Sequence, residues 1–202
     1  MISLLQNIPS EVVAAIIGAS ALLISKLIDL LYKKLSTKND KNDFSYLNKD
    51  YEIDKLLWEK LKEFNADRVY LCQFHNGGKY QSGMSMKKFT MTNEVTSDAI
   101  QEPSINFFKE RLVSEFTGIF RGLIFDKKYE CENANIEEDA LVQNTLKKFG
   151  EGSFYLYLIE DINKAPLGYV GLHYNEHKVL SKEQKEVLAN FSQSLVVLVK
   201  SN

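Results

Sequence analysis

The chain has 202 residues, of which 45% are hydrophobic and 26% are charged, and it contains ten glycines and three prolines. This composition excludes a disordered or fibrous chain, and the length allows one ordinary domain rather than a multidomain enzyme. The 25 basic residues nearly balance the 27 acidic ones and are interspersed with them, so nucleic acid is not expected as a partner.

The first 34 residues are predicted to form a transmembrane anchor. Residues 12–24 carry no charge and the apolar run continues to Tyr32, which gives a helix long enough to cross a hydrocarbon core of about 30 Å at about 1.5 Å per residue. Lysines follow this run at positions 33, 34 and 38 and none precedes it, so the positive-inside rule predicts a single-pass membrane protein with a cytoplasmic C-terminal domain. The anchor positions are Val12, Ile16, Ile17, Leu22, Leu23 and Leu27.

Two charges within this run, Lys26 and Asp29, each cost about 2.5 to 3.5 kcal/mol at the centre of a membrane. Both lie in the last third of the run, where Lys26 can extend toward the headgroups and pair with Asp29. An interfacial or oligomerising helix and a cleaved signal peptide are the alternatives. Small residues at positions 18–21 would let such helices pack closely, which leaves open a membrane effector whose N-terminal helices oligomerise into a lesion or channel under control of the soluble domain.

Residues 35–48 are rich in Asn, Asp, Lys and Ser and predict a polar linker, so the domain is expected to span residues 49–202. Its first helix is predicted to end near Phe64. A strand over residues 68–75 should stop at the Asn-Gly-Gly of residues 76–78, and a second strand is predicted from Lys87 to Glu94. Residues 106–116 then indicate a short helix and residues 118–125 an extended segment.

The second half of the domain gives clearer patterns. A helix is predicted from Ala140 to Phe149, followed by a β-hairpin whose two strands flank a connection at residues 163–168. Ser181 with Gln184 three positions later forms a capping-box pattern for a last helix. The buried stripe of that helix is predicted to be Val187, Leu188, Phe191, Leu195 and Leu198.

This order of elements resembles the GAF family. The closest likeness lies in residues 153–199, which hold the strand PLGYVGLHY and the Ser-initiated helix LSKEQKEVLANFSQSLVVLV. The resemblance implies an α+β, GAF/PAS-like sensor domain: an antiparallel sheet flanked by helices, with the first and last helices on one face and a ligand-sized cavity on the other. It also implies small-molecule sensing and dimerisation, and no functional residue is transferred from the family to this chain.

The candidate ligand-binding residues are His75, Asn76, Gly77, Gly78 and Lys79, which follow the first strand. The Asn-Gly-Gly backbone can present amide groups to a polar or anionic ligand, and Lys79 adds a cation. The alternative is an ordinary hairpin turn, for which Asn-Gly is a strong signal. No nucleotide-binding glycine motif supports a more specific ligand, so the cofactor is unknown.

No catalytic residue and no metal site are predicted. Cys72 and Cys131 are far apart in the sequence and are expected to be free thiols. His173 and His177 lie four positions apart, a spacing that brings two ligands together on a helix but not on a strand. The expected function is therefore a non-catalytic, membrane-anchored sensory or regulatory module that binds a small ligand or a protein partner. A homodimer is expected through the first helix, at Ile53, Leu57, Trp58 and Leu61, and through the last helix.

Overall fold

The computed structural model describes residues 20, 23–29, 46–83, 85–100, 102–136, 139–150 and 152–200. The chain divides into two compact units, residues 1–46 and 47–202. In the first unit, residues 23–29 are helical and Leu23 and Leu27 are exposed. Among the described residues, no helix has the length and apolar character needed to cross a bilayer. The other predicted anchor positions, Val12, Ile16, Ile17 and Leu22, lie outside the described residues.

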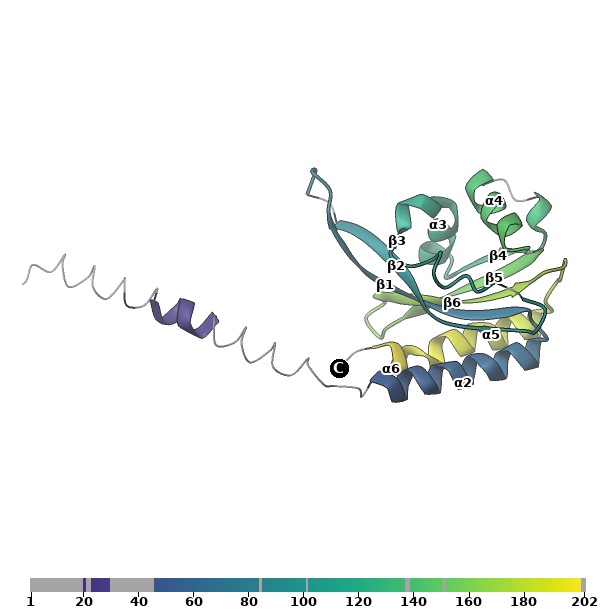
Figure 1. Cartoon of the computed structure of the whole chain (residues 1–202), viewed down its shortest axis with the longest axis horizontal. Helices are drawn as coiled ribbons and strands as arrows, with labels where there is room; N and C mark the ends of the chain where they lie inside the picture. The colour runs from purple at the N-terminus through teal and green to yellow at the C-terminus, as the bar shows by residue number, and fades with distance from the viewer. Residues whose placement is uncertain are drawn as a thin grey trace, which may run out of the picture. The chain divides into compact units, whose positions relative to one another are not determined.

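The second unit is built on one six-stranded antiparallel sheet with the strand order β3-β2-β1-β6-β5-β4. The strands are β1 (Arg68–Lys79), β2 (Ser85–Thr96), β3 (Arg111–Leu112), β4 (Lys128–Cys131), β5 (Ser153–Glu160) and β6 (Pro166–Tyr174). The α-helices are α2 (Tyr46–Phe64), α3 (Thr117–Phe125), α4 (Ala140–Lys148), α5 (Lys182–Ser194) and α6 (Val196–Val199), and the 3₁₀ turns are η2 (Val113–Phe116) and η3 (Ala134–Ile136). Figure 1 shows α2 and α5 together on one face of the sheet and α3 and α4 on the other.

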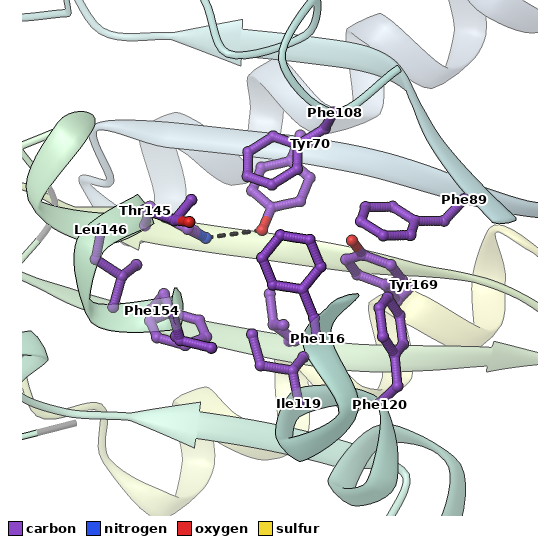
Figure 2. Close-up of a pocket in the computed structure, with 13 residues that line it drawn as sticks. Tyr70, Phe89, Phe108, Phe116, Ile119, Phe120, Thr145, Leu146, Phe154 and Tyr169 are labelled. Carbon is purple, nitrogen blue, oxygen red and sulfur yellow. Dashed lines mark hydrogen bonds between the residues drawn. The ribbon is translucent and has the colours of Figure 1, made fainter. Parts of the chain in front are cut away.

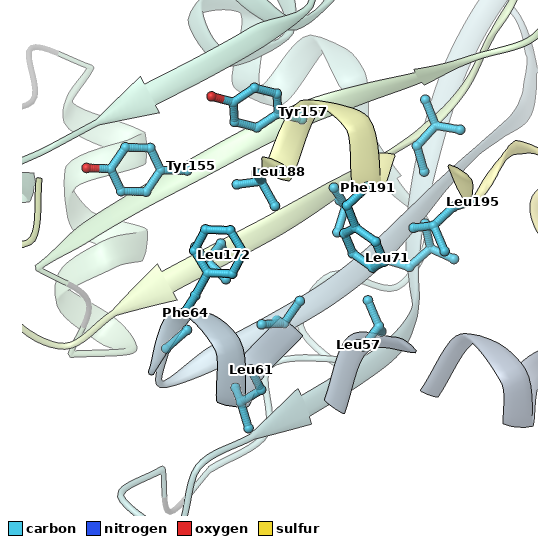
Figure 3. Close-up of a cluster of buried hydrophobic side chains, with 14 of the residues drawn as sticks. Leu57, Leu61, Phe64, Leu71, Tyr155, Tyr157, Leu172, Leu188, Phe191 and Leu195 are labelled. Atoms are coloured by element: carbon cyan, nitrogen blue, oxygen red, sulfur yellow. The ribbon is translucent and has the colours of Figure 1, made fainter. Parts of the chain in front are cut away.

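Strand alternation divides the core into two apolar clusters, one on each face of the sheet. On the α2–α5 face, Val69, Leu71, Val170 and Leu172 belong to one cluster with residues of the two helices. Figure 3 shows Leu71 and Leu172 of this cluster together with Leu57 of α2 and Leu188 of α5. On the α3–α4 face, the neighbouring strand positions contribute Tyr70, Cys72 and Tyr169. Both clusters consist only of residues from Ile53 to Val199, so the second unit contains a complete core of its own.

Helix α2 begins at Tyr46, inside the segment predicted as linker. Its apolar positions recur every three or four residues and place Ile53, Leu57 and Leu61 against the sheet, where they are 1%, 0% and 5% exposed. These three residues were predicted to form a dimer interface, which is wrong because they belong to the core of their own chain. Trp58, from the same prediction, is 44% exposed.

The first hairpin is longer than predicted. The Asn-Gly-Gly of residues 76–78 does not end β1, because the strand continues to Lys79 and the register with β2 shifts between Asn76 and Gly78. Gly78 has φ +106°, which fits an irregularity that inserts a residue into one strand and bends it. The glycines therefore bend a projecting arm, and the turn comes after Lys79.

Two predictions in the middle of the chain are also wrong. Residues 106–116 are not an α-helix: Glu110 takes φ 53°, outside the α-helical region, Arg111–Leu112 pair with β2 as β3, and Val113–Phe116 form the 3₁₀ turn η2. Residues 118–125 are helical, as α3, rather than extended. Their β-favouring side chains are spaced so that Ile119, Phe120 and Leu123 face the sheet, and this packing overrides the local preference for a strand.

Most of the C-terminal predictions are confirmed. The exceptions are that Val187, predicted within the buried stripe of the last helix, is 37% exposed, and that this helix is divided at Leu195 into α5 and α6. Strands β5 and β6 form the expected hairpin, and α4 occupies residues 140–148. Ser181 and Gln184 make both hydrogen bonds of the capping box at the start of α5. Lys60 of α2 lies 5.3 Å above the ring of Phe191 of α5, which joins the first and last long helices on one face.

Candidate functional site

A small, partly open cavity lies on the sheet face covered by α3 and α4. Its volume is about 40 Å³. Seven aromatic side chains form most of its wall, and Figure 2 shows their rings turned toward one another: Tyr70, Phe89, Phe108, Phe116, Phe120, Phe154 and Tyr169. The other lining residues are Ile119, Val142, Thr145, Leu146, Leu156 and His173. We call this space the inner cavity.

The main polar feature of the inner cavity is a hydrogen bond between the Tyr70 hydroxyl and His173 Nε2, 2.7 Å apart, drawn as the dashed line in Figure 2. Both residues are buried, at 5% and 6% exposure. They come from adjacent strands, where Tyr70 lies opposite Gly171 and His173 lies two positions further along β6. A Cβ atom on Gly171 would lie 2.2 Å from Tyr70 Cζ, so only glycine allows the phenol ring to cross β6 and reach His173.

The aromatic wall is continuous from the inner cavity toward the projecting arm of β1 and β2. The Phe120 ring lies 5.0 Å from Phe89, 5.8 Å from Tyr169 and 5.7 Å from Phe74. These centroid separations are typical of favourable aromatic pairs. The wall leaves Cys72 without solvent access, and its burial raises the pKa of the thiol, despite a hydrogen bond with Tyr169. Burial likewise raises the pKa of Tyr169, so both groups are neutral at physiological pH.

A buried ion pair lies between the first two strands of the sheet. Arg68 and Glu94, on neighbouring strands, are 1% and 3% exposed at their side chains and form a charge-assisted hydrogen bond. The Glu94 carboxylate also accepts hydrogen bonds from the Ser104 amide at 2.9 Å and the Ile105 amide at 2.9 Å. The Arg68 guanidinium lies 5.5 Å from the Phe149 ring at the end of α4. Glu94 therefore joins the sheet to the segment that carries Phe108 into the cavity wall.

The predicted ligand-binding residues lie outside the inner cavity. His75 and Asn76 line a second, open hollow between the arm, α3 and the β5–β6 turn, while Gly77, Gly78 and Lys79 continue along the arm without lining either space. The imidazole of His75 hydrogen-bonds the Thr90 hydroxyl at 2.9 Å. This hollow, which we call the outer pocket, has a volume of about 440 Å³. It is lined by Phe74, His75, Asn76, Lys87, Val113, Phe120, Ile124, Ala165 and Pro166.

Tyr70, Gly171 and His173 were not predicted as site residues from the sequence. His173 was considered only as a metal ligand with His177, and among the described residues no group of three or more His, Cys, Asp or Glu side chains is placed to hold a metal ion. Strand alternation alone puts Tyr70, Tyr169 and His173 on one face. The pairing of Tyr70 with Gly171 depends on the register of β1 against β6, which one sequence does not reveal.

Comparison with solved structures shows that the chain has a GAF-like fold. One match is to the GAF domain region of a proposed membrane protein from Geobacter sulfurreducens, with a TM-score of 0.57 and 16% identity. The aligned residues are 76% of this chain and 93% of that one. The blue-light absorbing form of the PixJ GAF domain of Thermosynechococcus elongatus gives a TM-score of 0.59 at 10% identity, over 78% of this chain and 88% of that one. A phycoerythrobilin-bound GAF domain from a cyanobacterial phytochrome gives 0.58 at 14% identity, over 77% and 87%.

Sequence comparison is less informative. No model of a known protein family matches the chain. An uncharacterised protein of Methanocaldococcus jannaschii is 28% identical over 145 residues, which are 68% of this chain. The chain matches about half the length of that relative.

Proposed function

We propose that the GAF-like domain is a non-catalytic sensory module whose inner cavity binds a small, mostly apolar ligand with one hydrogen-bonding group. The observation that carries this proposal is the aromatic cavity with the Tyr70–His173 pair at its wall. Binding sites for small molecules are largely apolar with a few placed polar groups. A hydroxyl or amide of the ligand would bind beside Tyr70 and His173 while its apolar part contacts the phenylalanine rings.

Ligand binding would have to enlarge the inner cavity. A volume of about 40 Å³ holds a few water molecules, whereas a benzene-sized guest occupies a cavity of about 150 Å³. The wall that would move includes Val142, Thr145 and Leu146, which all come from α4. Displacement of α4 by a ligand would change the surface of the domain, and this is the signal that a sensory module needs.

Tetrapyrroles are the ligands of some domains with this fold, but we do not propose one here. Drug-sized ligands need pockets of about 300 to 1,000 Å³, far more than the inner cavity offers. Both cysteines are buried. Burial raises the pKa of Cys72, so the Cys72 thiolate is not available to form a thioether bond to a tetrapyrrole. A smaller ligand fits the observed geometry better.

Thermal denaturation tests the ligand proposal. We expect phenol, benzyl alcohol or indole at millimolar concentration to raise the melting temperature of residues 46–202 and of the full chain. Val142→Ile adds a methyl group inside the cavity and should reduce this shift at least by half, while Val170→Ile adds the same group to the opposite cluster and should leave the shift unchanged. If none of these compounds stabilises the protein, or if both variants respond alike, the inner cavity is not the binding site.

We also propose that the N-terminal helix anchors this module in a membrane, with the sensory domain in the cytoplasm. The support is the uncharged run over residues 12–24 and the lysines that follow it. The full chain should remain with membranes after alkaline carbonate extraction, and residues 46–202 should be released. Release of both would contradict the anchor.

A homodimer through the exposed surface of α2 and α5 is proposed in place of the predicted interface. Leu47, Tyr51 and Trp58 on α2 and Val187 on α5 are exposed apolar residues of these helices, and such surfaces commonly mark protein contacts. Trp58→Glu should convert a dimer to a monomer in size-exclusion chromatography with light scattering. Phe125→Glu, at an exposed position of α3, is the control that should leave the mass unchanged. A wild-type monomer at high concentration would refute the dimer.

A further inference from the structure

We propose that the outer pocket is a second binding site, and that it takes an amphiphilic anion: an apolar body with one carboxylate. Its volume of about 440 Å³ is within the range of small-molecule sites, about 300 to 1,000 Å³. Unlike the inner cavity, it can accept a ligand without rearrangement. The inference goes beyond the proposed function because this pocket can be filled while the inner cavity is empty.

The apolar body of the ligand would contact the floor of the pocket. Phe74 from β1 and Phe120 from α3 form this floor, with their ring centroids 5.7 Å apart, and Val113 and Ile124 extend it on the helical side. Phe120 is 4% exposed and also lines the inner cavity. A ligand in the outer pocket would therefore touch the ring that separates the two spaces.

The charge of the pocket favours an anion. Lys87 lies at its rim, where its ammonium group donates a hydrogen bond to the neutral Asn76 side chain at 2.8 Å. None of the lining residues is acidic. An adjoining hollow of about 360 Å³ shares Lys87, Phe120 and Ile124, adds Arg121, and likewise has no acidic lining residue. An ammonium group beside an apolar surface and without a carboxylate partner attracts a ligand carboxylate.

The neighbouring Lys88 differs from Lys87 in its surroundings. Successive residues of a strand point to opposite faces, and Lys88 lies against Gly77 and pairs with Glu110 at 3.1 Å. Lys87 and Lys88 thus have the same charge and adjacent positions in β2, but only Lys87 lines the outer pocket. This pair provides a matched control.

The test is a titration of the full chain, and of residues 46–202, with 4-phenylbutyrate and with the uncharged 4-phenyl-1-butanol. Methyl NMR of Ile124 reports the outer pocket, and Ile119, which lines only the inner cavity, reports the other site. We expect saturable shifts at Ile124, with the carboxylate binding at least about fivefold more tightly than the alcohol, the size of one moderately exposed charge interaction.

Lys87→Gln should remove this preference and leave the alcohol unaffected, while Lys88→Gln should change neither affinity. The inference is overturned if the two compounds bind equally, if Lys88→Gln acts like Lys87→Gln, or if only Ile119 responds. In the last case the proposed inner site survives without the outer one. If Ile124 responds but phenol does not bind at the inner cavity, the outer site survives without the inner one. The two proposals can therefore fail separately.

Discussion

Gly171 determines where the Tyr70 ring lies. The absence of a side chain at this position lets the phenol pass across β6, and a Cβ atom there would lie 2.2 Å from Tyr70 Cζ and 2.4 Å from its hydroxyl oxygen. Glycine inside a strand usually weakens it. Here the cross-strand tyrosine covers the glycine and gains a buried hydrogen bond to His173.

Gly171→Ala should therefore displace Tyr70, break its hydrogen bond to His173 and destabilise the domain by about 1 to 3 kcal/mol through overpacking. Urea denaturation measures the change. Gly118→Ala in α3 is the control, because a Cβ atom there would have its nearest contact at an ordinary 3.4 Å. Equal stability of Gly171→Ala and the wild type would show that the Tyr70 ring does not need this gap.

Sequence patterns predict the surroundings of individual residues only in part. The alternation of residues 68–75 and 153–159 correctly separates residues of the two clusters, because burial on one face follows a period of two. The cavity itself arises from contacts between strands and helices far apart in the sequence. Phe116, Phe154 and His173 meet only after folding, and no local spacing predicts their proximity.

At the scale of the elements, Glu94 connects β2 to β1 and to the segment at residues 104–105. Its partner Arg68 is almost fully buried. Removing one member of a buried ion pair strongly destabilises the fold, because the other charge stays buried without a partner. Glu94→Gln should destabilise the domain by about 3 kcal/mol or more in urea denaturation.

The matched control for this prediction is Glu110→Gln. Glu110 pairs with Lys88, but its side chain is 62% exposed. The urea unfolding midpoint of Glu110→Gln should therefore stay close to the wild-type value. A similar small effect in both variants would mean that the Arg68–Glu94 pair does not hold the segment in place.

A second ion-pair network links β4 to α5. Burial alone would raise the pKa of Glu130, but hydrogen bonds from Lys185, Lys128 and Tyr157 outweigh it and lower the pKa to about 2. The folded state therefore binds a proton at Glu130 less readily than the unfolded state. Glu130 stabilises the fold fully above its ordinary pKa of 4.5, and this stabilisation is lost as the pH falls toward 2.

Glu130→Gln should lower the free energy of unfolding by about 1 kcal/mol at pH 7. The difference from the wild type should shrink between pH 5 and pH 2, in the range set by the two pKa values. Urea denaturation across this range measures it. Glu132→Gln, which removes the more exposed partner of Lys185, should have a smaller effect, and a difference for Glu130→Gln that is independent of pH would contradict the assigned cause.

Element prediction failed where tertiary contacts override local preference. The residues of α3 favour strands individually, yet Gly122 lets the helix approach Tyr129, where a Cβ atom would lie 2.9 Å from Cδ2. The Asn-Gly-Gly of residues 76–78 is a strong turn signal, but in β1 it bends a strand that remains paired to Lys79. The capping box of α5 was predictable because all of its partners lie within four residues.

At the scale of the whole molecule, the two faces of the sheet have different roles. Helices α2 and α5 cover one face of the sheet with a closed aliphatic and aromatic core. Helices α3 and α4 cover the other face (Figure 1), where the inner cavity lies. The family resemblance correctly predicted this division. It did not predict the site residues, because domains with this fold share architecture at 10% to 16% identity without sharing side chains.

The most direct test of the central claim is methyl NMR of the full chain, and of residues 46–202, during titration with phenol. Ile119 lines the inner cavity and Ile53 lies in the cluster on the opposite face. The account predicts saturable shifts at Ile119, none at Ile53, and loss of the Ile119 response in Val142→Ile. No saturable shift at Ile119, or equal shifts at both methyl groups, would contradict a ligand site between the sheet and α4.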